Sequence, residues 1–304
     1  MDVNALKYLV THSFKEWRED NASRLSAALA YYTIFSIPPL LIIAIAIAAQ
    51  LFDRAAVQQQ VIDQMSGLVG DPGAEVIESV LENSSESGQS VLAAVISVVT
   101  LLLGASGVFA ELHNALNTIW EVEPKPGRGI WGTVKDRFFS FTMVLGVGFL
   151  LLVSLVISAA LAAVNEFISG ALPGLVILAQ VINFLVSFGV VTGLFALIFK
   201  VVPDVKIAWR DVWIGALVTA FLFTIGKFAI GLYLGNSAPG STYGAAGSLI
   251  VLLLWVYYSA QILFLGAEFT QVYANRFGSR IVADEDAIAT SPTAQPAPGV
   301  SATK

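Results

Sequence analysis

Six long apolar segments alternate with polar stretches along the chain, and each is long enough to cross a lipid bilayer as a helix. A membrane-spanning helix needs about 20 mostly apolar residues, because the hydrocarbon core is about 30 Å thick and each residue rises about 1.5 Å. The predicted spans cover residues 27–52, 90–110, 138–164, 172–199, 212–234 and 247–269. We therefore expect an all-α, polytopic membrane protein, with a six-helix transmembrane bundle in residues 1–282.

The stretches outside the spans have patterns of their own. One face of an N-terminal helix carries the apolar residues Leu6, Leu9, Val10, Phe14 and Trp17. This predicts an N-terminal interfacial helix, although a surface helix packed on the cytoplasmic loops explains the pattern equally well. Residues 53–89 predict an extracytoplasmic helical hairpin, and residues 283–304, rich in Ala, Ser, Thr and Pro, predict a disordered cytoplasmic tail.

The charged residues are few and unevenly placed. Only 12% of the 304 residues are charged, whereas soluble domains contain about a quarter. Fourteen of the sixteen Lys and Arg residues fall on one side of the six spans, with Arg54 on the other side and Lys227 inside a span. Because cytoplasmic loops accumulate Lys and Arg, we expect both termini in the cytoplasm.

Polar side chains inside the spans are the first functional candidates, because burying them in lipid is costly. Lys227 is expected about 22 Å from the cytoplasmic boundary, at the depth of Gln180 and Asn183 in the preceding span. The three side chains are predicted to meet, while snorkelling of Lys227 to the outer interface is the alternative. Glu268 falls at the cytoplasmic boundary, about 20 Å from the depth of Lys227, which excludes an ion pair between them.

Two spans carry polar stripes. In the last span, Tyr257, Gln261 and Glu268 lie within a sector of about 40°. In the second, a stripe of small and polar residues repeats at spacings of three and four and includes Glu111. Small residues let helices approach closely, so this second stripe predicts either a packing seam or the lining of a pathway.

The first span is expected to be broken near its midplane by Pro38 and Pro39, which remove two backbone donors. Discontinuous helices at this depth often build transport sites. A structural kink satisfied by the hydroxyls of Thr33 or Ser36 is equally plausible. Tyr32 and Ser36, on the same helix, complete the candidate pathway residues.

Three long strings resemble one known family. They are Asp20-Asn21-Ala22-Ser23-Arg24 followed by AALAYYTIFSIPPLL from Ala27, GASGVFAELHNALNTIWEV from Gly104, and YGAAGSLIVLLLWVYYSAQILFLGAEFTQVYA from Tyr243. The chain is similar over about residues 6–277 to the YihY/virulence factor BrkB family of bacterial inner-membrane proteins. The resemblance implies six spans and a bacterial plasma membrane, and it brings no catalytic residues to carry over.

Most enzyme classes lack their parts in this sequence. There is no cysteine, P-loop, GxGxxG, GxSxG or HExxH, and the only histidines, His12 and His113, have no metal-ligand spacing. We therefore expect no catalytic, cofactor or metal site and no nucleic-acid partner, although the family has carried a ribonuclease label. The polar residues favour a transporter or a lipid- or solute-handling protein. Its expected partners are the lipid bilayer and an anionic lipid or small solute. A structural or scaffolding envelope protein is the alternative.

Overall fold

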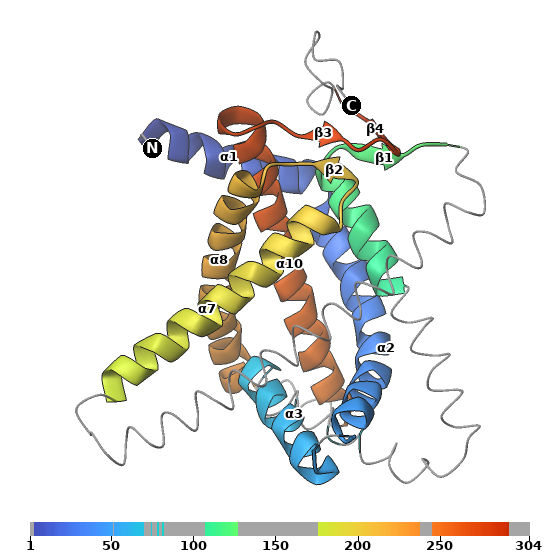
Figure 1. Cartoon of the computed structure of the whole chain (residues 1–304), viewed down its shortest axis with the longest axis vertical. Coiled ribbons are helices and arrows are strands. Elements are labelled where there is room, and N and C mark those ends of the chain that lie inside the picture. The colour runs from blue at the N-terminus through green and yellow to red at the C-terminus, as the bar shows by residue number, and fades with distance from the viewer. Residues whose placement is uncertain are drawn as a thin grey trace.

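The computed structural model describes residues 3–50, 52–69, 74, 78, 81, 107–126, 176–237 and 245–291 (Figure 1). Its long helices are α2 (Ala22–Ala48), α7 (Val176–Val201), α8 (Trp209–Ser237) and α10 (Ala245–Phe277). Two shorter helices, α1 (Val3–Glu19) and α3 (Arg54–Val69), lie at opposite ends of the molecule, and another helix runs through residues 107–119 (Figure 1). The described chain is thus mostly helical, as predicted.

Three of the described helices are long and apolar enough to cross a membrane. Their apolar windows are Phe184–Val201 in α7, Trp209–Tyr233 in α8 and Leu249–Phe277 in α10. These windows fall on the predicted spans 172–199, 212–234 and 247–269, and α2 covers most of the predicted span 27–52. The span 138–164 and most of 90–110 lie outside the described residues, so the count of six stays a prediction.

The backbone of α2 is continuous over Pro38 and Pro39, so the expectation of a broken helix was wrong. Each proline removes one donor, but the helical hydrogen bonds before and after the pair keep the backbone in register. The nearby hydroxyls do not bond the carbonyls that the prolines leave free. Instead Thr33 Oγ1 donates to Leu29 O at 2.7 Å, and Ser36 Oγ donates to Thr33 O at 3.0 Å.

The central helix α10 packs on α8 along one side and on α2 along another (Figure 1). Contact with α8 is close because glycines meet threonines: a Cβ at Gly215 would overlap Thr270, and one at Gly266 would overlap Thr219. Both hydroxyls are satisfied within their own helices, since Thr219 Oγ1 donates to Gly215 O at 2.7 Å and Thr270 Oγ1 to Gly266 O at 2.6 Å. The helices can therefore pack closely without leaving a threonine hydroxyl group without a hydrogen bond.

The helix at residues 107–119 also packs closely against α2 at a glycine. A Cβ at Gly107 would lie 2.7 Å from Cδ1 of Tyr32. Farther along, Leu116 and Ile119 are fully buried in a core cluster that also holds Phe199 of α7 and Phe264 of α10. At Gly107, then, the stripe containing Glu111 packs against a neighbouring helix.

At the far end of α2, α3 begins the segment predicted as a hairpin. Asp53 caps this helix, because its Oδ1 accepts a hydrogen bond from Ala56 N at 3.0 Å. Val57 of α3 and Leu81, one of three described residues beyond it, share a small cluster with Ile45 and Ala48 of α2. The rest of residues 70–89 lies outside the described residues, so the hairpin as a whole stays a prediction.

Four short strands gather at the end of the molecule that carries α1, which we call the strand end (Figure 1). Here β1 (Val122–Pro124) pairs antiparallel with β4 (Ala287–Ala289), and β2 (Val205–Lys206) pairs antiparallel with β3 (Val282–Ala283). The loops between them are joined by Lys125 N donating to Asp286 O at 3.0 Å and Asp284 N donating to Asp204 O at 2.9 Å.

This pairing corrects the prediction of a disordered tail from residue 283. Residues 283–291 are ordered, and Ala287 is buried. Their Ala-rich composition resembles that of disordered segments, but strand pairing uses backbone groups that composition does not reveal. Residues 292–304 lie outside the described residues.

The glycine–threonine seam between α8 and α10 predicts a matched pair of substitutions. We expect Gly215→Ala to lower stability by about 1–3 kcal/mol, because its methyl group has no room beside Thr270. Gly231→Ala, in the same helix, meets nothing within 4 Å and should be neutral or slightly stabilising. Thermal unfolding of the two purified variants in one detergent measures the difference, and equal melting temperatures would contradict the seam.

Candidate functional site

Glu268 is the most deeply buried acidic side chain among the described residues. It lies in the last third of α10 with 0% of its surface exposed, and its neighbours Phe264 and Ala267 are equally buried. Within the described part of the chain, the only side-chain partner of its carboxyl group is another carboxyl group, that of Asp20. A buried carboxyl group without a neutral or basic partner is costly, so its presence requires an explanation.

Three other acids act on Glu268. Asp20 and Glu16, at the end of α1, and Glu121, which follows the helix at 107–119, all interact with it electrostatically. Asp20 and Glu16 are four residues apart and therefore share one helix face. We call Glu16, Asp20, Glu121 and Glu268 the acidic site.

The backbone turns sharply at two points beside these acids. Asn21 adopts the left-handed conformation with φ 53°, which ends α1 and starts α2 one residue later. Its carbonyl accepts a hydrogen bond from Arg24 N at 2.8 Å, and its side chain donates to Glu19 O at 3.1 Å. Asn tolerates this conformation better than most residues, so it suits a turn that brings the end of α1 against α10.

Glu121 occupies the second turn, with φ 56°. Two contacts from the C-terminal segment hold it there: Thr290 N donates to Glu121 O at 2.8 Å, and Ser291 Oγ donates to its carboxylate. Residues after β4 thus help to position one member of the acidic site.

The electrostatics of the acidic site favour the uptake of protons. Burial raises the pKa of Asp20 to about 6, and the charges of Glu16 and Glu121 add to this rise, while a side-chain hydrogen bond with Glu268 lowers it. Lys15 lies 3.9 Å from Glu16. Within the described residues, neither Asp20 nor Glu268 has a Lys or Arg partner at ion-pair distance. Two close, buried carboxyl groups without a cation cannot both ionise easily, so the pair tends to retain a proton.

Several polar atoms of the same core also lack partners. Within the described residues these are Ser13 Oγ, Trp17 Nε1 and Trp120 Nε1. Ser13 and Trp17 lie on the face of α1 that carries Asp20, and Trp17 packs against the cluster that contains Trp120 and Phe264. Buried polar atoms without protein partners usually bond to water or a ligand, so this region suits a hydrated proton site.

Two further acids at the strand end, Asp204 and Asp211, have hydrogen-bond partners. Asp204 accepts from Asn117 Nδ2 at 3.0 Å and lies 3.2 Å from His113 Nε2, and Asp211 accepts from the backbone and the hydroxyl of Ser279, both at 2.7 Å. His113 thus contacts a loop that is far from it in the sequence. Across the described ranges, no group of three His, Cys, Asp or Glu residues is placed to hold a metal ion.

The predicted site residues fall in three places. Tyr257 and Gln261 are partly buried along α10, about three and two turns before Glu268. Glu111 is partly buried and interacts electrostatically with Arg24. Glu268 therefore lies near acids at the end of α1, whereas Tyr257, Gln261 and Glu111 lie elsewhere.

Lys227 lies well away from the acidic site. Its neighbour Gly226 meets Tyr258 and Ile262 of α10, so Lys227 lies about six to ten residues, or about 9–15 Å, from the level of Glu268. Its side chain is exposed. The side chains of Gln180, Asn183, Pro38 and Pro39 lie outside the description, so the expected contact of Lys227 with the amides stays a prediction.

Sequence reasoning missed Asp20, Glu16 and Glu121. Polar residues within the predicted spans were the first candidates, and these three acids lie outside the spans. Asp20 was nevertheless part of the first string that resembles the family. Its position directly before a turn into an apolar helix was a signal that the residue could face the membrane end of the bundle.

Comparison with known proteins agrees with the membrane character of these helices. A UPF0761 membrane protein of Mannheimia succiniciproducens is 28% identical over 89% of this chain and 91% of its own length. One of Alteromonas mediterranea is 28% identical over 84% of each chain. Another, of Alkalilimnicola ehrlichii, is 28% identical over 86% of this chain, which spans only 57% of that longer protein. No solved structure matches the chain.

The model of one family covers nearly all of the described structure, from the middle of α1 to the end of β4. It is named virulence factor BrkB and matches residues 13–289, which include every member of the acidic site. The match extends beyond residue 277, where the resemblance of the quoted strings ended, and takes in the ordered C-terminal strands. This membrane protein belongs to the virulence factor BrkB family.

Proposed function

We propose that this protein is a transporter or a lipid- or solute-handling protein of the bacterial inner membrane, and that the Asp20–Glu268 pair binds and releases a proton during its cycle. The observation that supports this is the carboxyl group of Glu268, fully buried in an apolar helix, whose only side-chain partner among the described residues is the carboxyl group of Asp20. Ionisable groups held in such segments commonly belong to proton or substrate pathways.

The position of Glu268 suits a coupling role. Its helix packs on α1, α2 and α8, so a change of charge at this residue acts on several contacts together. Protonation favours the buried, closely packed arrangement, and loss of the proton places a charge where no cation balances it. Two charge states with different preferred packing are what a coupled conformational change requires.

The acidic site and the remaining predicted residues together suggest a route. We place the strand end in the cytoplasm, because the Lys and Arg residues concentrate on the loops at that end. Lys227, Gln180 and Asn183 then lie toward the outer side, where an anionic lipid or solute would meet a cation. No catalytic step is proposed for this chain.

The first test concerns the proton on Asp20. A pKa raised from 3.8 to about 6 means that the folded protein holds this proton more tightly than the unfolded chain. The stabilisation is complete below about pH 4 and is lost as the pH rises through about 6. The melting temperature of Asp20→Asn should therefore equal that of the wild type at about pH 4. At about pH 7.5 it should be higher than that of the wild type.

Melting curves across this range, followed by tryptophan fluorescence in detergent, measure the difference. Glu123→Gln is the matched control, because Glu123 is an exposed acid at the same end. Its difference from the wild type should not change with pH. A pH-independent difference for Asp20→Asn would remove Asp20 from the proton site.

The second test concerns transport. Proteoliposomes adsorbed to a solid-supported membrane should give a transient current on a step from about pH 7.5 to 5.5, because protons enter a site within the membrane field. Asp20→Asn should reduce this current by about tenfold or more, since the carboxyl group with a pKa of about 6, which takes up the proton over this step, is gone. Glu123→Gln should leave it unchanged.

The same vesicles, prepared with fluorescent lipids whose outer-leaflet label dithionite destroys, test lipid movement between leaflets. Faster loss of fluorescence than in empty vesicles assigns lipid handling, and a panel of anionic solutes assigns solute transport. If the wild type gives neither a current nor any movement of lipid or solute, the structural role becomes the better explanation.

A further inference from the structure

We propose that the solvent-exposed face of α1 binds anionic phospholipid headgroups at the membrane surface. This face places an exposed apolar strip beside cations that have no acidic partner among the described residues. This inference is independent of the acidic site, which uses another face of the same helix.

At 100° per residue, the side chains of α1 form three adjoining strips. The first, with Leu9 and Ser13, is buried against the bundle. The second is apolar and exposed: Leu6 is 54%, Val10 50% and Phe14 51% accessible, at spacings of four residues. Leu6 lies only about 20° around the helix from Ser13, so the apolar strip directly adjoins the buried one.

The third strip is basic and lies beyond the apolar one. It contains Lys7, Lys15 and Arg18, all exposed. Lys15 is balanced by Glu19 at 3.2 Å, whereas Lys7 and Arg18 have no acidic partner among the described residues. Apolar residues flanked by unbalanced cations are typical of helices that lie in the interface of an anionic leaflet.

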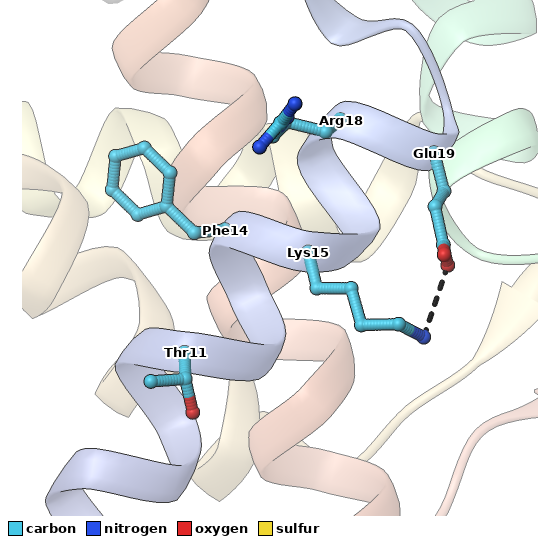
Figure 2. A pocket seen from close by; sticks show the side chains of 5 residues that line it. All are labelled: Thr11, Phe14, Lys15, Arg18 and Glu19. Carbon is cyan, nitrogen blue, oxygen red and sulfur yellow. Dashed lines mark ion pairs between the residues drawn. The ribbon is translucent and has the colours of Figure 1, made fainter.

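Figure 2 shows the surface where the two strips meet. A shallow groove there is lined by Thr11, Phe14, Lys15, Arg18 and Glu19, all from α1. The ring of Phe14 and the guanidinium of Arg18 extend to the same side of the helix, while Lys15 reaches away from them toward Glu19 (Figure 2). This arrangement suits a lipid, with its acyl chain against Phe14 and its phosphate at Arg18.

The depth of α1 fits this partner. The guanidinium of Arg276 lies 5.3 Å from the ring centroid of Tyr8, and Asp20 meets Glu268, so α1 crosses the last two turns of α10. The apolar window of α10 has 29 residues and is therefore about 43 Å long, more than the roughly 30 Å of the hydrocarbon core. Its final turns reach the headgroup layer, and α1 lies against them.

A spin label at Val10 tests the proposal, because the chain has no cysteine and Val10→Cys carries the only label. Asn4→Cys is the control, since Asn4 is exposed and lies about 120° around the helix from Val10, away from the apolar strip. Both proteins are placed in nanodiscs that hold one copy each, made of phosphatidylcholine alone or with about a third of phosphatidylglycerol. Collisions of the label with oxygen and with a water-soluble nickel chelate report its depth.

We expect the Val10 label in anionic discs to collide mainly with oxygen, and the Asn4 label to collide mainly with the nickel chelate. In neutral discs the Val10 label should become several-fold more accessible to nickel. Adding Lys7→Gln and Arg18→Gln should abolish the difference between the two lipid mixtures. Arg54→Gln, an exposed cation in α3 at the opposite end, should preserve it.

Three results would overturn the proposal. One is equal nickel accessibility at Val10 and Asn4 in anionic discs, which would make α1 a solvated surface helix. Another is protection of Val10 that does not depend on lipid charge or on Lys7 and Arg18. The third is protection only in discs that hold two copies, which would make the strip an interface between chains.

Discussion

The close contact between α8 and α10 is the constraint on which the rest of the structure depends. Gly215 and Gly266 leave no room for a Cβ, so the opposing threonines fit against bare backbone. In lipid, the hydrophobic effect contributes little to association between helices, and close packing of this kind replaces it. Once α10 is held in this way, its other sides are available to α1 and α2, and Glu268 is enclosed where they converge.

The surroundings of Glu268 differ from those of Asp204 and Asp211, which also lie near this end of the molecule. Asp211 lies at the start of α8 and Asp204 in a loop, and both accept hydrogen bonds from neighbouring segments. Those carboxylates join segments together. Within the described residues, Glu268 meets only the carboxyl group of Asp20 and the charges of further acids, so it contributes charge repulsion rather than cohesion. That contrast separates a structural carboxylate from a functional candidate more clearly than depth in the membrane does.

Much of the helical architecture was predictable from sequence, and the errors have physical causes. The predicted spans at 172–199, 212–234 and 247–269 overlap the apolar windows Phe184–Val201, Trp209–Tyr233 and Leu249–Phe277, because length and hydropathy dominate there. Only the middle span agrees to within a few residues at both ends. The prolines of α2 were misjudged, since helices tolerate a lost donor when the flanking hydrogen bonds persist. The strand at Ala287–Ala289 was missed because its partner is 165 residues earlier in the chain at Val122–Pro124.

Asn21 has a mechanical consequence. A single left-handed residue links the turn that ends α1 to the first residue of α2, so the connection contains almost no slack. Any tilt or lift of α1 must either rotate the start of α2 or change the torsion angles of Asn21 itself. Replacing Asn21 with a run of flexible residues would uncouple the two helices while leaving each one intact. The linker therefore acts as a stiff joint between the surface of the membrane and its interior.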